Sequence, residues 1–427
     1  MERVMSEAET SNRNFAREGR SRSQIEKALV AGRQGDLDWR DPKNLQASYF
    51  AGDDVVSIAA DAYDLYMGDN VIYGPTLYPS LPRLEAEVVA MVKEMLNAPA
   101  TAGGSVTTGG TESIMMAVKT ARDWAREHKP NATAPEILTS ESAHPAFGKA
   151  AHYLGLEVAR VPLGLDYAAD AAAMAAAVTA NTVMITGSAP PYPMGVVDPI
   201  ESIGAIAAEH DLWMHVDACG GGFFLPFAEA LGEPVPCFDF RVDAVSSISV
   251  DLHKYGYANR GSSTLLLRDA ALERYQRFAH DAWSGGAYST LNFVGSRAGG
   301  PVASAWAVMR YLGFDGYTER VRAILHAKRR FVEGIGGIEG VCVLGAPQGG
   351  HFSIGSTGKV DIDAVAEGLL AKGWRMGRMQ RPPALLLLLN HAHGAVAAEF
   401  LDDLRVTVDA VMAGHIQSSG ETTVYTS

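Results

Sequence analysis

Short apolar runs alternate with helical segments through the middle of the chain, and this alternation restricts the possible folds more than any other feature. We expect strands at residues 136–140, 182–190, 212–218, 243–249 and 263–269. Helical segments are expected between them at 111–128, 168–180 and 199–211. Strands that alternate with helices favour a mostly parallel sheet covered on both faces. The sequence therefore predicts an α/β fold.

The flanking segments divide the chain into three parts. Residues 81–96 carry apolar side chains at helical spacing, and a Gly/Thr-rich turn is expected at 101–110. After Phe314 the chain restarts with a helix, two apolar strands and a final helix at 397–414. We expect an N-terminal tail and arm at 1–67, in which residues 1 to about 20 are a polar tail. A large domain is expected at 68–313 and a smaller C-terminal α/β domain at 314–427.

Composition limits the classes of partner. The formal net charge of −13 argues against nucleic acid and against an anionic membrane surface. Three scattered cysteines indicate neither a disulfide framework nor a zinc site, so we expect a cytoplasmic protein. Purely apolar stretches, such as 384–389, are far short of the roughly 18 residues that span a bilayer. No transmembrane segment is expected.

Two other patterns favour structural roles. The histidines of "HAH" (391–393) would share one face of a strand-like run, but two imidazoles without a third ligand predict no metal site. The basic segment "HAKRR" (326–330) is expected at the solvated end of a helix.

Four features fall at the carboxyl ends of predicted strands, where open α/β sheets bind ligands. "TTGGTES" (107–113) opens a helix with glycines and hydroxyls, which suits either an anion cradle or a plain N-cap turn. Asp217 closes a strand, where it can cap a turn or hold a positive ring nitrogen. His144 can be structural or can stack on a ligand, and Lys254 can be a paired cation or a covalent catalyst.

Taken together, the four features match the requirements of pyridoxal phosphate. The lysine would form the Schiff base, and its nucleophilicity requires a lowered pKa, which we expect from a partly desolvated cationic site. The carboxylate would keep the pyridine nitrogen protonated, so that the ring acts as an electron sink. The Gly/Thr turn would take the cofactor phosphate.

The order of several motifs carries a resemblance to a known family. The chain reads "TTGGTES", "SAHPAF", "APPYPMGVVDP", "HVDACGGGF", "DLHKYGYANRGSS" and "WSGGAYSTLNFVGSRAGG". This order resembles the sphingosine-1-phosphate lyases, which belong to the group II pyridoxal-phosphate decarboxylases, over roughly residues 20 to 415. The resemblance implies the fold type I architecture, with a seven-stranded type of sheet, and a homodimer with shared active sites.

The resemblance also implies roles for individual residues. Lys254 matches the Schiff-base lysine, His253 its neighbour at the cofactor phosphate, and Asp217 the partner of the pyridine nitrogen. Other matching positions are the ring-stacking His144, the phosphate turn Gly109, Gly110 and Thr111, the active-site Tyr192, and Ser296, which would reach the cofactor phosphate from the other subunit.

At the substrate end the sequence departs from the family pattern. Asn70 is retained, but Tyr73 stands where the lyases have a histidine that reaches the substrate. Arg260 keeps the basic residue that binds the substrate phosphate, six positions after the lysine. The loop after Tyr288 also has a different sequence. Phosphate recognition is expected to be weakened rather than erased.

The resemblance implies a carbon–carbon lyase that acts on a phosphorylated 2-amino-3-hydroxy long-chain base. Retro-aldol cleavage would release a fatty aldehyde and phosphoethanolamine. Two alternatives stay open: an amino-acid decarboxylase of group II on the same cofactor, and a non-catalytic protein that binds pyridoxal phosphate as a regulator. Release of carbon dioxide rather than aldehyde would identify the decarboxylase.

Overall fold

The computed structural model describes residues 18–46 and 48–420, so most of the predicted N-terminal tail lies outside the described residues. The chain divides into two units, residues 1–41 and 42–427. The first contains α2 (Arg22–Gly32), which begins after Ser21. The Ser21 hydroxyl accepts a hydrogen bond from the Gln24 N–H, and the Gln24 side chain accepts one from the Ser21 N–H. This capping box explains where the helix starts.

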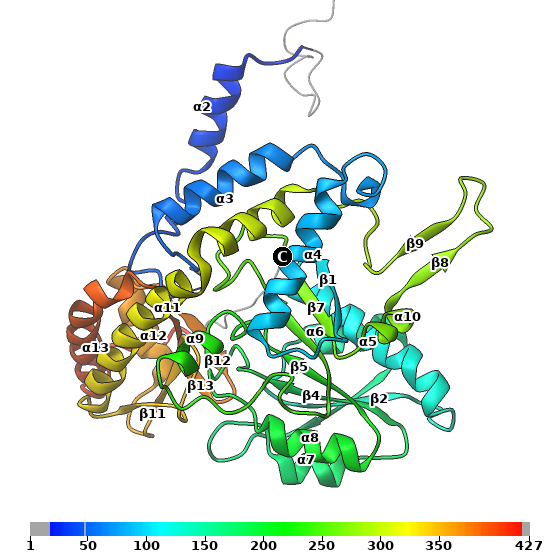
Figure 1. The fold of residues 1–427 in the computed structure, drawn as a ribbon. Coiled ribbons are helices and arrows are strands. Elements are labelled where there is room, and N and C mark those ends of the chain that lie inside the picture. The colour runs from blue at the N-terminus through cyan, green and yellow to red at the C-terminus, as the bar shows by residue number, and fades with distance from the viewer. Residues whose placement is uncertain (1–17, 47, 421–427) are drawn as a thin grey trace, which may run out of the picture. The chain divides into compact units, whose positions relative to one another are not determined.

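A seven-stranded sheet forms the centre of the second unit, in the order β1-β7-β6-β5-β4-β2-β3 (Figure 1). The neighbours from β6 to β3 pair in parallel, and β7 runs antiparallel to both β1 and β6. The predicted mostly parallel α/β sheet is therefore confirmed. The strands are β1 (Gly103–Thr107), β2 (Glu136–Ser140), β3 (Glu157–Val161), β4 (Thr182–Ser188), β5 (Trp213–Asp217), β6 (Val245–Asp251) and β7 (Ser263–Leu267).

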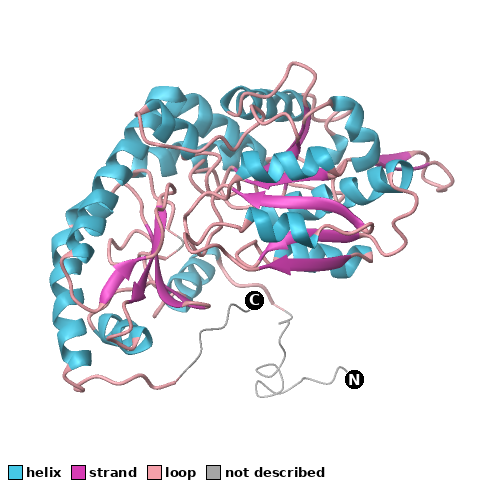
Figure 2. Cartoon of the chain, turned by 90° about the horizontal axis from the view of Figure 1, so that it is seen from below, coloured by secondary structure: helices cyan, strands magenta, loops and turns pink. Residues whose placement is uncertain are grey.

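Helices cover both faces of this sheet (Figure 2). Because β4, β5 and β7 are buried at every position, their side chains need cover on both sides. The helices of this part of the chain are α3 (Asp53–Tyr66), α4 (Ser80–Met95), α5 (Gly110–His128), α6 (Ala146–Leu154), α7 (Ala171–Ala177), α8 (Ile200–Glu209), α9 (Leu225–Ala230) and α10 (Glu273–Gln276), with the short turns η1 (Val71–Tyr73) and η2 (Ala270–Leu272).

A second, antiparallel sheet has the order β10-β11-β13-β12. Its elements are β10 (Val341–Val343), β11 (His351–Ser356), α12 (Ile362–Ala371), β12 (Gly377–Gln380), β13 (Pro383–Leu388), η3 (His393–Ala395) and α13 (Ala397–Met412). The long α11 (Gly300–Gly336) leads into it and is kinked at Gly313, which has φ 55°. The kink coincides with the predicted domain boundary at 313/314, and the division itself stays a prediction. β8 (Phe278–His280) and β9 (Tyr288–Thr290) pair as a separate hairpin.

The expectation of a turn across 101–110 was wrong for most of its length. Gly103–Thr107 is strand β1, in register with Leu267–Ser263 of β7. The glycines mark close packing here, because a Cβ on Gly104 would lie 2.7 Å from the Leu266 side chain and 3.0 Å from that of Val89. Only residues 108–109 connect the strand to α5.

Two local expectations were also wrong. The "HAKRR" segment is helical, and His326, Arg329 and Arg330 are exposed as expected, but it lies inside α11 rather than at its end, and Lys328 is partly buried. The "HAH" segment follows β13 as a turn, in which the Asn390 N–H donates to Nδ1 of His393. In the described part of the chain, no group of three His, Cys, Asp or Glu side chains forms a metal-ligand set, and no helix is long and apolar enough to cross a membrane.

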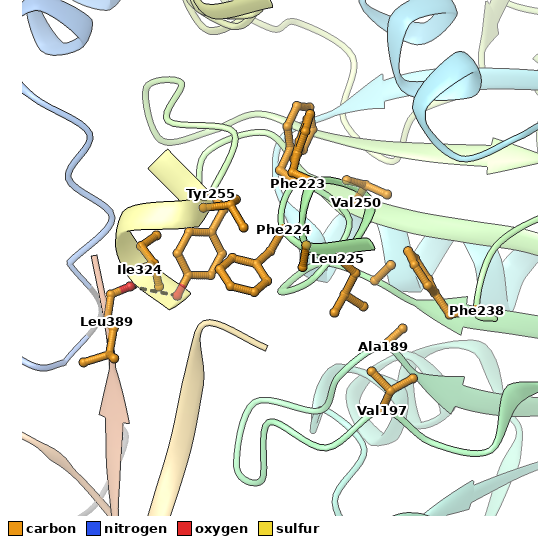
Figure 3. Close-up of a cluster of buried hydrophobic side chains, with 14 of the residues drawn as sticks. Ala189, Val197, Phe223, Phe224, Leu225, Phe238, Val250, Tyr255, Ile324 and Leu389 are labelled. Atoms are coloured by element: carbon orange, nitrogen blue, oxygen red, sulfur yellow. Dashed lines mark hydrogen bonds between the residues drawn. The ribbon is translucent and has the colours of Figure 1, made fainter. Parts of the chain in front are cut away.

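A buried aromatic cluster joins the two sheets (Figure 3). The Tyr255 ring packs against Phe224, with the ring centroids 5.2 Å apart. The Tyr255 hydroxyl donates a 2.9 Å hydrogen bond to the carbonyl of Leu389, at the end of β13. The segment that follows β6 is thereby fixed to the second sheet.

Candidate active site

A cavity of about 330 Å³ opens beyond the carboxyl ends of β4, β5 and β6, beside the N-terminus of α5. It brings together eight residues predicted from sequence: Gly109, Gly110, Thr111, His144, Tyr192, Asp217, His253 and Lys254. Several other lining residues had no role predicted from the sequence, among them Tyr49, Glu112, Asp251 and His351. The site therefore lies where an open α/β sheet places its ligand.

Lys254 forms an ion pair at the base of this cavity. Its Nζ lies 3.0 Å from Oδ2 of Asp251, the last residue of β6. The Asp251 side chain is 3% exposed, and its Oδ1 has no hydrogen-bond partner. Burial opposes the charged form of the lysine, but the attraction of Asp251 together with smaller contributions from Tyr49, Cys219 and Asp217 outweighs it and raises the pKa of Lys254 well above its ordinary value.

The predicted lowered pKa of Lys254 is therefore wrong for this structure. Asp251, 3.0 Å from the ammonium group, and Asp217 are anionic rather than cationic, and both raise the lysine pKa. Asp251 shows the converse effect: burial raises the pKa of its carboxyl, but attraction to Lys254, together with smaller contributions from His253 and from hydrogen bonds, lowers the pKa overall. The pair holds the lysine protonated, so the proton must leave before Nζ can act as a nucleophile.

Asp217 and His144 are held in defined orientations. Oδ1 of Asp217 accepts hydrogen bonds from the Cys219 N–H at 3.0 Å and from the Ser249 hydroxyl at 3.4 Å. Nδ1 of His144 accepts the Ala146 N–H at 3.1 Å, which leaves Nε2 to carry the proton of the neutral ring. The Asp217 carboxylate and the His144 imidazole therefore line the same cavity in orientations that these hydrogen bonds fix.

The Gly/Thr turn forms a compact cradle. Glu112 accepts hydrogen bonds from both the N–H and the hydroxyl of Thr108 at 2.6 Å, and from the Phe293 N–H at 2.8 Å. A Cβ on Gly110 would lie 2.8 and 2.9 Å from the carboxylate oxygens of Asp251, so only glycine fits there. The first N–H groups of a helix have no partner within that helix, so the start of α5 can bind an anion.

His253 lines the cavity next to the lysine, and Arg260 lies near the lining residue Tyr49. Nδ1 of His253 donates to the carbonyl of Ser262 at 2.6 Å. Burial lowers the His253 pKa, against the attraction of Asp251. The guanidinium of the exposed Arg260 lies 5.7 Å from the ring centroid of Tyr49, which lines the cavity.

Five predicted residues lie outside the lining of this cavity: Arg260 and the four described next. Asn70 donates from Nδ2 to the Ser296 hydroxyl at 3.1 Å. Tyr73 is 53% exposed on η1, and Tyr288 is partly buried on β9. Within one chain, then, the cofactor-type residues assemble, whereas Asn70, Tyr73, Tyr288 and Ser296 form a second group.

Some of the lining residues without a predicted role could have been found from the sequence, and others could not. Asp251 ends a buried strand three residues before Lys254, which was a usable clue. Tyr49 lies in the predicted N-terminal arm, and His351 begins β11 of the second sheet. Neither of these has a neighbouring motif, and only tertiary structure brings them to the cavity.

The fold and the cavity define an α/β enzyme of the fold type I class. The pyridoxal-dependent decarboxylase conserved domain matches residues 23–339. Sphingosine-1-phosphate lyases of rice and Arabidopsis thaliana are 39% and 42% identical over 90% and 79% of this chain. This chain covers 72% and 62% of their lengths. The chain belongs to the pyridoxal-dependent decarboxylase family and is a homologue of the sphingosine-1-phosphate lyases within it.

Solved structures agree with this assignment. A sphingosine-1-phosphate lyase of Burkholderia pseudomallei matches with a TM-score of 0.90 and 36% identity, over 94% of each chain. A glutamate decarboxylase of Lactobacillus brevis matches with a TM-score of 0.81 at 21% identity, over 96% of this chain and 98% of that one, and this likeness concerns the fold alone.

Gly110→Ala tests the cradle. The added methyl group would press on the Asp251 carboxylate and on Cys219 Sγ, which lies 3.0 Å from the Cβ position. We expect at least about tenfold weaker binding of pyridoxal 5′-phosphate, measured by titration of its visible absorbance. Gly336→Ala is the control, because a Cβ there meets no atom within 4 Å. Unchanged affinity in Gly110→Ala would show that the start of α5 does not bind the cofactor phosphate.

Proposed function

We propose that the protein is a pyridoxal 5′-phosphate-dependent aldehyde lyase, which cleaves a phosphorylated 2-amino-3-hydroxy long-chain base into a fatty aldehyde and phosphoethanolamine. The observation that carries the proposal is the cavity in which Lys254, Asp217, His144 and the start of α5 meet. The identity with sphingosine-1-phosphate lyases across most of the chain supports the choice of reaction within the family.

The lining residues fit the cofactor group by group. The start of α5 at Gly110 and Thr111, beside His253, would hold the phosphate. Asp217 would pair with the ring nitrogen, and His144 would lie against the ring. Lys254 would bind the aldehyde carbon. The bound ring supplies the electron sink that cleavage of the substrate C2–C3 bond requires.

The protein side chains then have to bind the substrate and move protons. The proton of Lys254 must leave, and the 3.0 Å ion pair with Asp251 opposes this loss. The C3 hydroxyl of the substrate must lose a proton as the C2–C3 bond breaks, and Tyr192, His253 and Lys254 are the candidates on the cavity wall. Tyr49 adds a hydroxyl to the same wall.

Arg260 supports a phosphorylated substrate. Its guanidinium is exposed beside Tyr49, at the edge of the cavity, and suits bidentate contact with a phosphate. Tyr73 can donate a hydrogen bond but brings no charge, so Arg260 would supply the main attraction.

An amino-acid decarboxylase is the second candidate. A probable L-tyrosine/L-aspartate decarboxylase of Methanothermobacter thermautotrophicus is 33% identical over 74% of this chain and 84% of its own length. The lyase-type histidine is also replaced by Tyr73. Both reactions use the same cofactor residues and differ in the bond at Cα that breaks.

We also propose that two chains share their active sites. The support is the second group of residues: Asn70 and Ser296 are hydrogen-bonded to each other and lie outside the cavity lining of their own chain. In a two-fold dimer each such group would complete the cavity of the partner.

Product analysis tests the function. With pyridoxal 5′-phosphate and a phosphorylated sphingoid base, we expect a long-chain aldehyde and phosphoethanolamine by mass spectrometry. Lys254→Ala removes the nucleophile and should lower the rate by at least about 10³-fold. Lys359→Ala, on the exposed surface, is the control. Carbon dioxide from amino acids, with no aldehyde from the phosphorylated base, would replace the lyase by the decarboxylase.

Mixing two inactive variants tests the shared sites. Lys254→Ala lacks the nucleophile, and Ser296→Asp would repel the cofactor phosphate of the partner. In a mixed dimer one site carries both defects and the other carries none. Random reassortment should therefore restore about a quarter of the wild-type activity. A mixture as inactive as its two components would place Ser296 in the site of its own chain.

A further inference from the structure

Two segments meet behind the wall of the cavity that carries Tyr192. The tyrosine turn, residues 189–198, connects β4 to α8 of the large sheet. The glycine loop, residues 345–351, leads from β10 into β11 of the second sheet and ends with His351, the first residue of β11. Tyr192 and His351, one from each segment, both line the active-site cavity.

Backbone hydrogen bonds hold the two segments together. The N–H groups of Gln348 and Gly349 donate to the carbonyl of Gly195 at 2.9 and 3.1 Å. The Val197 N–H donates to the side-chain oxygen of Gln348 at 2.9 Å. The glycines also allow close approach, because a Cβ on Gly195 would collide with the carbonyl of His351.

His351 extends this contact to the cavity. Burial lowers its pKa to about 4, so the ring is neutral. Its Nε2 lies 3.1 Å from the carbonyl of Pro191 and donates to it. The ring centroid of His351 lies 5.9 Å from that of Tyr192. A shift of the glycine loop would therefore move the residues on either side of Tyr192.

Lys328 anchors the glycine loop from its other side. This residue projects from the C-terminal half of α11, and its ammonium donates to three consecutive carbonyls: Pro347 at 3.0 Å, Gln348 at 3.4 Å and Gly349 at 3.0 Å. One positive charge thus draws the backbone of three neighbouring residues to α11. Charge-assisted hydrogen bonds of this kind are the stronger class in proteins.

We propose that Lys328 is a positioning residue that fixes Tyr192 through the glycine loop. The catalytic consequence rests on the proposed function, because it requires Tyr192 to act on the substrate. The structural consequence does not: without the ammonium, the glycine loop and the tyrosine turn should open more often.

The charge on Lys328 is sensitive to pH. Burial lowers its pKa to about 8; Glu233 opposes this shift, and Arg329 adds to it. Lys328, Glu233 and Arg329 line a surface cavity of about 390 Å³, and Glu333 is a further charged residue in its lining. The glycine loop contributes only the neutral His351 as a titratable group.

The sign of the pH effect separates positioning from stability. Because the folded pKa lies below the unfolded value of 10.5, folding releases this proton between pH 8 and 10.5. For Lys328, the free energy of unfolding therefore rises with pH in this range. The hold on the three carbonyls weakens in the same range, since the positive charge is lost. As the pH rises through this range, kcat should therefore fall while the contribution of Lys328 to the free energy of unfolding increases.

The test uses Lys328→Met, which removes the charge, and Lys328→Arg, which keeps it above pH 8. Lys359→Met on the exposed surface is the control. Hydrogen exchange followed by mass spectrometry is measured on cofactor-loaded protein at pH 7.5 and 9.5. In Lys328→Met we expect exchange in residues 191–198 and 346–351 to be about tenfold faster at pH 7.5. The aldehyde-forming kcat should fall about tenfold, because the misplacement of one group costs rate.

In wild type, kcat should decline as the pH rises through about 8. Lys328→Arg should lack this decline and should match wild type at pH 7.5. Wild-type exchange in Lys328→Met, or the same decline in Lys328→Arg, would overturn the proposal. If no variant forms aldehyde, the substrate is wrong, and the exchange data still decide the positioning. If Lys328→Met does not fold, the test is hydrogen exchange of the same residues in Lys328→Arg at pH 9.5. This exchange should be slower than in wild type.

Discussion

The ion pair between Asp251 and Lys254 is the interaction on which the site depends. Asp251 is the last residue of β6, which lies between β5 and β7 in the sheet, and Lys254 follows three residues later. The Asp251 carboxylate is 3% exposed and lies 3.0 Å from the lysine Nζ. Because a buried carboxylate without a cation is costly, the pair keeps Lys254 at the cavity base before any ligand binds.

The ion pair also determines which residues can lie next to it. Gly110 must be a glycine because the Asp251 carboxylate occupies the space of a side chain, and this brings the start of α5 down to the lysine. The hydroxyl of Tyr255, the next residue after Lys254, is bound to the end of β13. The lysine is therefore fixed relative to both sheets, and the loops of the second sheet can supply His351 to the same cavity.

Much of the fold was predictable from sequence because local pattern and tertiary structure agree. The strands around 136–140, 182–190 and 212–218 are apolar runs bounded by turns, and a buried parallel sheet requires this pattern. The prediction of a turn at 101–110 was wrong because the glycines at 103 and 104 allow close packing inside β1. The "HAKRR" segment misled because the carbonyls that bind Lys328 come from a loop about 20 residues further along the chain.

The candidate site was predictable where the sequence carries motifs. Lys254, Asp217 and the glycines of α5 follow strand ends, so strand prediction placed them together. The pKa of Lys254 could not be predicted, because it depends on a pair geometry that the sequence does not show. Tyr49 and His351 come from separate parts of the chain and meet the site only in the folded protein.

The central claim is that Lys254 binds the aldehyde carbon of pyridoxal 5′-phosphate. The most direct measurement is borohydride reduction of the cofactor-loaded protein, followed by peptide mass spectrometry to locate the modified lysine. Modification of Lys254, at one group per chain, is the predicted result. Modification of another lysine, or of none under conditions where the cofactor absorbance shows binding, would contradict the account.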